Sequence, residues 1–435
     1  MPWRDTLSPV QMKRVGIVAP AAARDGVLAA LAAAGTVELD LPHTPGDGAE
    51  ELERTAHAAV ASGPVVGWVG WAPARELPAL TGTLGGLGAA VVPLKRPRGV
   101  QPPTLLAPTR TPRLSRSLVQ TYGTVPYADV DPSRLAGIAY VVMFGMMFGD
   151  VGHGALLVLA GLLLRSGRIN RLVPLRRTWA FVVGAGALAM CFGLLYGEAF
   201  GPTGLVPVLW LDPLEDPIPI LIAALVIGAV LLAGAYVIGT INRVREGGWG
   251  YALYASSGVA GSALFLAVGL LVWGIVADIG PLTLAAVVLA AVALGLVFVG
   301  FYIDAGGGGA GVAQAVIEVV DTVIRLGSNV VSFMRLAAFG LTHAALLMVV
   351  WDGTTALWAP GWRAAAAVLL FLVGNILTFA LEALVAGIQA LRLEYYELFS
   401  RIFTSEGRPF RPWAPTLPAD APDSLADTSH ERGHP

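Results

Sequence analysis

The chain has 435 residues, of which 55% are apolar and 13% are charged, and its formal net charge at pH 7 is −2. A mean hydropathy of +0.69 indicates a polytopic membrane protein. With only two lysines and no basic face, the sequence excludes nucleic acid as an expected partner. The lone Cys191 excludes an internal disulfide, and its apolar surroundings predict a buried thiol.

Residues 1–100 are expected to form a small soluble α+β lobe. Two β-α-β units in this segment predict a ferredoxin-like sandwich. The expected strands are 15–18, 36–41, 65–71 and 89–94, and the expected helical segments are 22–34, 50–61 and 74–87. Residues 101–133, rich in Pro, Arg, Thr and Ser, are expected to be a linker.

Residues 134–403 are expected to form the transmembrane domain of a mainly α-helical protein. The pattern predicts eight helices, of which the last two are longer than a bilayer requires and are therefore tilted. The expected ranges are 135–149, 152–165, 178–199, 218–242, 251–276, 282–303, 312–351 and 364–400. The Pro- and Asp-rich tail, 404–435, is expected to be disordered.

Arginine is distributed unequally between the loops. Clusters of arginine follow the second, fourth and last predicted helices, whereas the opposite loops carry acidic residues or only Arg363. This bias places both termini in the cytoplasm, with the chain in the plasma membrane. The N-terminal residues lack the apolar core of a signal peptide, so we expect later segments to drive insertion.

An arginine lies within the seventh predicted helix, in the run from Phe333 to Leu336. The guanidinium of Arg335 stays protonated at physiological pH, and holding it at bilayer depth costs from a few to more than ten kcal/mol. No acidic residue lies one turn away along the helix. The sequence therefore predicts that Arg335 belongs to an ion pathway.

Polar residues form a seam on each of the last two predicted helices. Positions seven or fourteen apart return to nearly the same helix face. On the seventh helix the seam and its margin comprise Asp321, Ser328, Asn329, Ser332, Arg335, Thr342 and His343, and on the eighth Asn375, Glu382, Gln389 and Arg392. Two facing seams would make a wet proton path, in which arginine is the group that cannot relay a proton.

Structural interpretations remain open for several of these residues. Asp321 could pair with Arg325 one turn away. His343 could be a packing histidine. Glu382 and Arg392 could pair with each other or anchor the helix at the interface.

Two further motifs stand near the outer ends of predicted helices. The run from Phe144 to Gly154 holds four glycines, which allow close backbone approach and a tight connection. Its Asp150 and His153 could line a channel mouth, although hydrogen bonding within the turn is the stronger interpretation. Glu198 ends the third helix, and a structural role is again favoured.

The sequence lacks several motifs of catalysis. There is no Gly-rich loop ending in Gly-Lys-Ser/Thr, no Cys/His spacing of a metal site and no nucleophile elbow. We therefore expect a non-catalytic chain without cofactor or bound metal, whose ion path is powered by another subunit.

These motifs together resemble subunit a, called subunit I in prokaryotes, of the V/A-type rotary ATPases. The matching runs are 144–154, 196–201 and 333–336 with His343, and Glu382 with Arg392. The lobe is also similar to the family's membrane-proximal lobe. The resemblance implies a membrane stator against which a proteolipid ring turns in a rotary motor. Arg335 would face the ring carboxylate, Arg392 would be an accessory arginine, and Glu382, Asp321 and His343 would serve two half-channels.

The implied partners are the proteolipid ring, the peripheral stalk, the ATPase head subunits and the lipid bilayer. The chain departs from the family where only residues 42–63 replace a long helical arm with a distal lobe. We therefore expect weaker contact with the stalk. Asn329 also stands where many relatives carry histidine. The alternative function is that of a divergent paralogue uncoupled from ATP, acting in regulation, assembly or ion conduction with other partners.

Overall fold

The computed structural model describes residues 8–41, 48–97, 100–106, 113–168, 170–403 and 407–415. The chain divides into two compact units. The first comprises residues 1–108, 124–127 and 406–435, and the second comprises residues 109–123 and 128–405.

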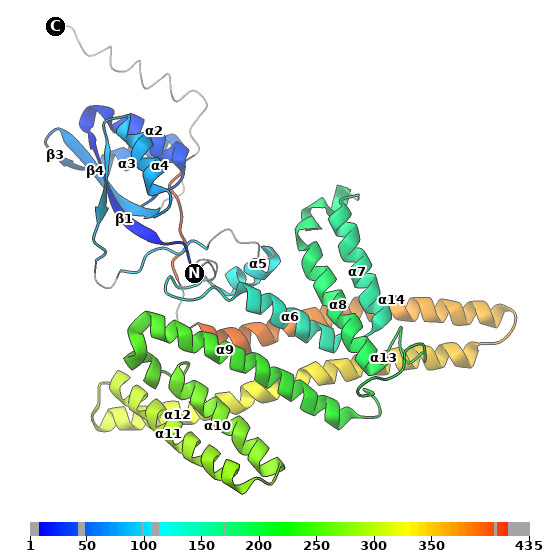
Figure 1. The fold of residues 1–435 in the computed structure, drawn as a ribbon. Coiled ribbons are helices and arrows are strands. Elements are labelled where there is room, and N and C mark those ends of the chain that lie inside the picture. Colours follow the sequence, from blue (N-terminus) through cyan, green and yellow to red (C-terminus); the bar gives the residue numbers. More distant parts are fainter. Residues whose placement is uncertain are drawn as a thin grey trace. The chain divides into compact units, whose positions relative to one another are not determined.

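The first unit is built on an antiparallel sheet whose strand order is β2-β4-β1-β5, with β3 paired to β4. Helices α2, α3 and α4 gather on one face of this sheet (Figure 1). In chain order the elements are β1 (Met12–Pro20), η1 (Ala21–Ala23), α2 (Arg24–Ala34), β2 (Glu38–Leu39), α3 (Gly48–His57), β3 (Val60–Ser62), β4 (Val65–Pro73), α4 (Leu77–Gly85) and β5 (Ala90–Leu94). The alternation of strands and helices agrees with the sequence pattern, which missed only β3.

Residues 407–415 belong to the lobe. Trp413 is buried in the hydrophobic core that also contains Ile17 and Leu28. Glu38 pairs with Arg408 and accepts a hydrogen bond of 2.7 Å from the backbone amide of Arg411. For residues 407–415 the expectation of a disordered tail is wrong, because the buried Trp413 indole and the Glu38–Arg408 ion pair hold this segment on the lobe. The tail beyond Pro415 lies outside the described residues.

The second unit is helical. Its elements are α5 (Arg113–Tyr122), α6 (Ser133–Met147), α7 (Val151–Ser166), η2 (Asn170–Thr178), α8 (Trp179–Tyr196), α9 (Pro217–Tyr254), α10 (Val259–Val276), α11 (Gly280–Asp304), α12 (Gly308–Ser332), α13 (Met334–Leu357), α14 (Trp362–Leu393), the π-helical turn η3 (Glu394–Phe399) and α15 (Ser400–Ile402). In the part of the chain that the structure describes, six helical segments are long and apolar enough to cross a membrane, and α6 and α7 are shorter apolar helices. The chain is thus a multi-pass membrane protein.

Several expected boundaries differ from the observed ones. The linker contains the helix α5, and Gly248 (φ 78°) interrupts α9 before Tyr254. Cys191 is exposed on α8, so the expectation of a buried thiol is wrong. The expected helix 312–351 is two helices, α12 and α13, which meet at Phe333. The π-helical turn η3 lies within the expected helix 364–400.

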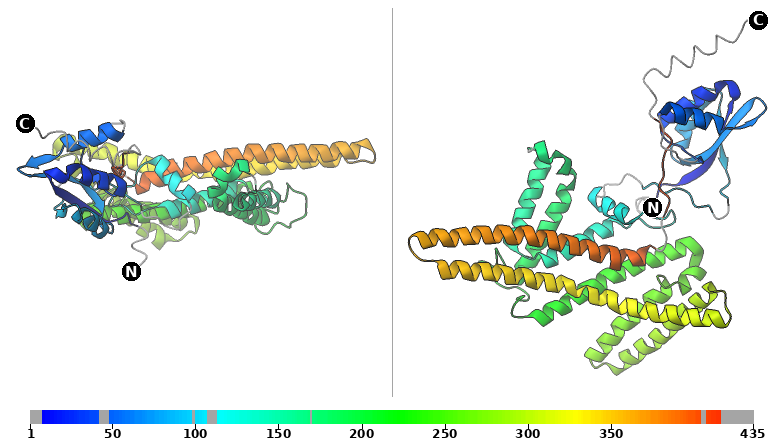
Figure 2. Two further views of the ribbon diagram at one scale, coloured as in Figure 1. Left: turned by 90° about the horizontal axis from the view of Figure 1, so that it is seen from above. Right: turned by 180° about the vertical axis from the view of Figure 1, so that it is seen from behind.

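Helices α13 and α14 run side by side as a long hairpin (Figure 2). Much of this hairpin is uncovered in the chain, and its exposed apolar residues include Leu346, Val349, Leu377, Leu381, Leu384 and Ile388. Apolar side chains in such number require lipid or a partner subunit over them.

The short helix α7 packs closely against α8, as the glycines predicted. A Cβ atom at Gly154 would lie 2.7 Å from the carbonyl oxygen of Gly186, and a Cβ at Gly186 would lie equally close to the carbonyl of Gly154. The two backbones therefore touch directly at this level. This contact fixes the start of α7, which carries Asp150 and His153.

Candidate functional site

The backbone tightens immediately before Arg335. The amide of Leu336 donates to the carbonyl of Phe333 at 2.9 Å, three residues back, in place of the carbonyl of Ser332. The Ser332 carbonyl is thereby released from the helical pattern, and it accepts a hydrogen bond of 3.1 Å from Nε of Arg335. A tight turn inside a helix is typical of a functional or strained position. Here it frees the Ser332 carbonyl for Arg335, whereas in an unbroken helix a backbone amide would donate to that carbonyl.

Phe333 holds this turn against α9. Its side chain is fully buried. A Cβ atom at Gly228 of α9 would lie 2.2 Å from the ring of Phe333. Only glycine leaves room for the ring at that position, so the Gly228–Phe333 contact sets the place where α12 ends and α13 begins.

Arg335 also has an acidic partner. Its Nη2 atom lies 3.2 Å from Oε1 of Glu397, and the Arg335 side chain is 25% exposed whereas that of Glu397 is 6% exposed. Glu397 stands in the π-helical turn η3, a rare conformation that is frequent at functional sites. The sequence reasoning took Arg335 to be an unpaired charge, and that is wrong. The two helices each depart from regular geometry where the ion pair forms.

One side of the helix around Arg335 is open. Ser328, Val331, Ala338 and Thr342, which lie three, four or seven residues from Arg335, are all exposed in the chain. Residues at these spacings share a helix face. The guanidinium thus stands on a stripe that the chain itself does not cover.

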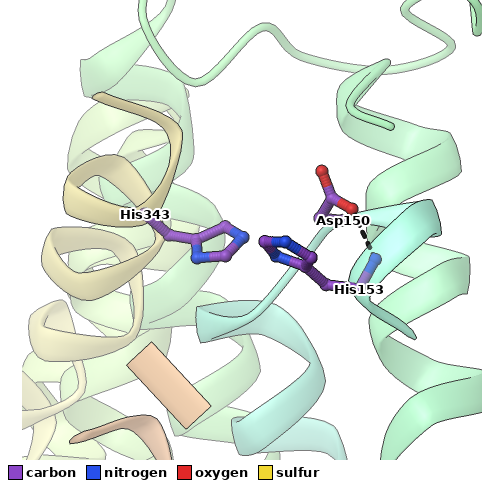
Figure 3. Close-up of side chains that lie close together, drawn as sticks. All are labelled: Asp150, His153 and His343. Carbon is purple, nitrogen blue, oxygen red and sulfur yellow. Dashed lines mark hydrogen bonds between the residues drawn. The ribbon is translucent and has the colours of Figure 1, made fainter. Parts of the chain in front are cut away.

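A second polar cluster lies about 12 Å further along α13, at ~1.5 Å per residue. Candidate ligand atoms of Asp150, His153 and His343 lie within 4.8 Å of one another, and all three residues are buried. Figure 3 shows that Asp150 and His153 come from the start of α7, and that the His343 ring points toward His153 from α13. Oδ1 of Asp150 accepts from the His153 amide at 2.8 Å, and Oδ2 accepts from the Gly201 amide at 2.9 Å.

Aromatic rings surround the two imidazoles. The centroid of the Phe148 ring lies 4.9 Å from that of His343, and the Phe379 and Phe200 rings lie 5.4 and 5.6 Å from that of His153. Both nitrogens of His343 and Nδ1 of His153 have no hydrogen-bond partner among the described residues. His343 is therefore a packed histidine, but its polar atoms are not satisfied by the chain.

The comparisons with known proteins bear on this arrangement. The model of the V-type ATPase 116kDa subunit family matches residues 65–201. A-type ATP synthase subunit I of Aeropyrum pernix is 29% identical over 350 residues, covering 68% of this chain and 49% of the relative. The corresponding subunit of Pyrococcus horikoshii is 27% identical and covers 68% of this chain and 45% of its own length.

Over these matches the chain is similar to subunit I of the V/A-type ATP synthases. A V-type ATP synthase subunit I of Treponema pallidum is 32% identical over a shorter match, which covers 35% of this chain and 36% of the relative. The chain spans about half the length of the A-type relatives named here. The family match from 65 to 201 includes both glycine-rich motifs, at 144–154 and 196–201.

Two of the residues predicted on α12, Asp321 and Asn329, have partners within the chain. The side chain of Asp321 pairs with Arg325 at 2.5 Å, so the local interpretation of this pair is confirmed. Ser328 is exposed. With its amide oriented to satisfy both of its groups, Asn329 donates to the Arg325 carbonyl and accepts from Arg401 at 2.8 Å.

The residues predicted on α14 are divided between the inside and the outside of the unit. Asn375 and Glu382 are buried, and Oε1 of Gln389 is buried without a partner in the described chain. Arg392 is exposed, and no carboxylate among the described residues forms an ion pair with it. Glu382 and Arg392, both described, do not form the ion pair that we considered; their roles in transport stay predictions.

The two glycine-rich motifs, 144–154 and 196–201, form local hydrogen bonds that stabilise the turns. Asp150 caps α7 through the His153 amide, which confirms the local interpretation of this turn. Glu198 lies beyond the end of α8, is 4% exposed, and accepts a backbone hydrogen bond of 2.9 Å from Val151. These contacts connect the two glycine-rich motifs to each other.

Sequence reasoning missed two acidic residues of the turn η3. Glu397 pairs with Arg335, and Glu394 is fully buried with both carboxylate oxygens unpartnered among the described residues. Both follow Arg392 closely in the sequence, but their spacing does not continue the seven-residue seam. Two carboxylates within four residues of an apolar helix end were the signal that could have found them.

A buried charged cluster, formed by Asp129, Arg243 and Glu246, ties the segment before α6 to α9. Nη2 of Arg243 lies 3.9 Å from Asp129, and Nη1 lies 2.9 Å from Glu246. Asn242 accepts from the Val130 amide at 2.9 Å. Burial raises the pKa of Asp129 to about 7, and the neighbouring Glu246 carboxylate contributes in the same direction.

Proposed function

We propose that the chain is the membrane stator subunit of a V/A-type ATPase or synthase and translocates protons together with a proteolipid ring. The observation that carries the proposal is the position of Arg335 on an exposed stripe of a membrane helix. A guanidinium facing lipid would be very costly, so a partner with a carboxylate is expected to cover it. A ring of proteolipids carrying a carboxylate within the membrane fits this requirement.

Arg335 would act on the ring carboxylate by electrostatics. A nearby guanidinium favours the ionised carboxylate and lowers its pKa. The ring carboxylate would therefore stay charged until it reaches an access channel, and Arg335 would prevent direct passage of protons between two half-channels. Glu397 would hold the guanidinium in place between passages, with Arg392 as an accessory charge.

The half-channels would be lined by the buried polar residues of α13 and α14. Glu382 and His343 are titratable and buried, and Asn375 is also buried. The half-buried Gln389 of α14 and Ser332, at the end of α12, offer further polar atoms. Asp321, Ser328 and Asn329 would lie on the other side of Arg335, and Asp150, His153 and Glu198 near the outer end. The chain itself would hold no catalytic site, since the ATPase head would supply the power.

We further propose eight transmembrane helices, formed by α6 to α14 with α12 and α13 as one bent span, and cytoplasmic termini in the plasma membrane. The strand order β2-β4-β1-β5 supports a ferredoxin-like lobe. Between β2 and β4 the described residues form α3 and β3, and the short length of this segment supports a lobe without a helical-hairpin arm. One docking surface for a peripheral stalk is expected, and a complex that dissociates readily in detergent.

Proton pumping by the complex tests the proposal. The complex is purified in mild detergent, its subunits are identified, and it is reconstituted in vesicles. Arg335→Gln is expected to abolish pumping while the chain remains inserted, and Arg335→Lys to fail largely because a desolvated lysine can lose its proton. Arg325→Gln is the matched control, since Arg325 is a surface arginine paired with Asp321, and it should pump nearly normally. Normal pumping by Arg335→Gln would refute the proposal.

The short segment between β2 and β4 also supports a second candidate, a paralogue uncoupled from ATP. The same purification separates the two. Co-purification of a proteolipid and nucleotide-binding head subunits supports the stator, whereas a chain that purifies with neither supports the paralogue. Electron microscopy of the complex then shows whether this chain makes one stalk contact or two separated ones, and two would contradict the short-arm interpretation.

A further inference from the structure

The buried cluster of Asp150, His153 and His343 combines two imidazoles and one carboxylate at the meeting point of α7 and α13. Their candidate ligand atoms lie within 4.8 Å of one another (Figure 3). All three side chains belong to residues that are at most 1% exposed. The cluster therefore differs from the exposed acidic groups on protein surfaces that often resemble a metal site without binding an ion.

The two imidazoles carry buried nitrogens that the described residues do not satisfy. Both nitrogens of His343 and Nδ1 of His153 are buried without a hydrogen-bond partner among the described residues. An unsatisfied buried polar atom costs about 1–3 kcal/mol, so a ligand or ordered water is expected on these atoms. The surrounding phenylalanines offer no acceptor or donor for them.

Asn375 fixes the tautomer of His153. Its Nδ2 atom donates to the Phe371 carbonyl at 2.9 Å, so its Oδ1 atom is the one that faces Nε2 of His153 at 3.1 Å. An oxygen acceptor requires the proton to be on Nε2, which leaves the lone pair on Nδ1. A histidine that donates its other N–H to an oxygen is the usual arrangement of a metal ligand.

The Asp150 carboxylate is also held in place by hydrogen bonds. Its two oxygens accept backbone hydrogen bonds from His153 and Gly201, which hold the carboxylate in place and leave lone pairs on both oxygens. The carboxylate lies beside two imidazoles, and no arginine or lysine among the described residues forms an ion pair with it. A divalent cation would supply the missing positive charge.

We propose that Asp150, His153 and His343 form a binding site for a divalent transition metal ion, for which Zn²⁺ is the best match. Two imidazoles and a carboxylate suit zinc, whereas Mg²⁺ and Ca²⁺ prefer oxygen ligands only. Ligand atoms around tetrahedral zinc lie about 3.4 Å apart, given bonds of about 2.0–2.2 Å. The three ligand atoms, now within 4.8 Å of one another, would therefore have to move closer on binding, and water would complete the fourth position.

Metal in this site would remove three groups from proton transfer, since a bound imidazole cannot accept a proton. Zinc would then inhibit pumping from within the membrane unit. Binding itself is independent of the function proposed above, whereas the inhibition rests on it. The experiments for the two are therefore separate.

Binding is measured on the purified full-length chain after chelator treatment, with Zn²⁺ by metal analysis and Co²⁺ by its visible absorption. The parental chain is expected to bind one ion that His343→Gln and His153→Gln lose. His57→Gln is the matched control, because His57 is an exposed histidine of the lobe next to Glu53, and it should bind like the parent. Asn375→Leu should weaken binding about 10–100-fold, as expected for loss of the hydrogen bond to a ligand.

Equal binding by the parent and His343→Gln would overturn the site, because the ion would then be held elsewhere. No high-affinity binding by the parent would also overturn it and would leave water as the partner of the imidazoles. Inhibition is tested on the assembled complex, where zinc should stop pumping by the parent and by His57→Gln, and chelator should restore it. A bound ion without inhibition would retain the site and refute only its effect on transport.

Discussion

The two polar sites of α13 hold their groups in opposite ways. Arg335 carries a permanent charge, has the acidic partner Glu397, and stands beside an exposed stripe. His343, eight residues further on, is almost fully buried among aromatic rings, and its nitrogens have no partner in the described chain. The difference follows from charge, since a guanidinium cannot become neutral whereas an imidazole can.

The comparison teaches what each site can do. A charge that is always present needs a fixed counter-charge when no external partner faces it, and Glu397 provides one. A group that can be neutral tolerates burial and stays free to take a proton or a metal ion. Arg335 is thus suited to act as a barrier, and the His343 cluster is suited to bind.

The largest effect is expected from breaking the ion pair. Glu397→Gln should lower pumping several-fold and lower the stability of the detergent-solubilised protein by about 2–4 kcal/mol, because it leaves a partly buried charge without its partner. The midpoint of thermal unfolding and the pumping rate of reconstituted complex measure the two effects.

A double-mutant cycle identifies the origin of that loss. In Arg335→Gln/Glu397→Gln both charges are absent, so most of the stability should return while pumping stays abolished. If the double variant is as unstable as Glu397→Gln alone, the instability does not come from the uncompensated charge of Arg335.

A gain in stability, instead of a loss, is expected from a substitution at His343. His343→Leu removes two unpartnered nitrogens from an aromatic pocket and should raise stability by about 1–3 kcal/mol in metal-free buffer. Thermal unfolding measures this, with His57→Leu on the exposed surface as the control expected to stay within about 0.5 kcal/mol. A less stable His343→Leu would mean that water already satisfies the imidazole.

The sequence predicts this contrast only in part. The cost of an arginine in an apolar helix indicates Arg335, and alternating patterns indicate the lobe strands. Glu397 escapes the pattern because it pairs from a π-helical turn that regular heptad spacing does not describe. His153 and His343 are 190 residues apart, so their meeting depends on how α13 packs on the helices before it rather than on any local spacing. A Cβ atom at Gly340 of α13, for example, would lie 3.1 Å from the carbonyl oxygen of Met146 in α6.

A smaller effect is expected from the acidic residues beside these two sites. Glu382→Gln should slow pumping several-fold without abolishing it, because water and neighbouring polar groups can substitute in part. Asp321→Asn should slow it less, since Asp321 is already paired with Arg325. Pumping rates measured across pH test both variants, and parental rates with unchanged pH dependence in both would make these residues structural.

The last effect is on the pH dependence of stability and concerns Asp129. Its carboxyl is buried like His343, and its partner Arg243 compensates its charge only in part. Burial raises the pKa of Asp129 from 3.8 to about 7, so between these values the folded protein binds a proton that the unfolded chain has lost. Stability contributed by this carboxyl should therefore fall as pH rises through about 4 to 7, and the full penalty should remain above pH 7. Asp129→Asn should flatten this dependence, and Glu246→Gln should reduce it, because Glu246 contributes to the raised pKa. Unfolding midpoints in detergent at pH 5 and pH 8 measure the slope. The same slope in parent and Asp129→Asn would show that another group titrates, and the Asp129 carboxyl would then be partnered as fully as Arg335 is.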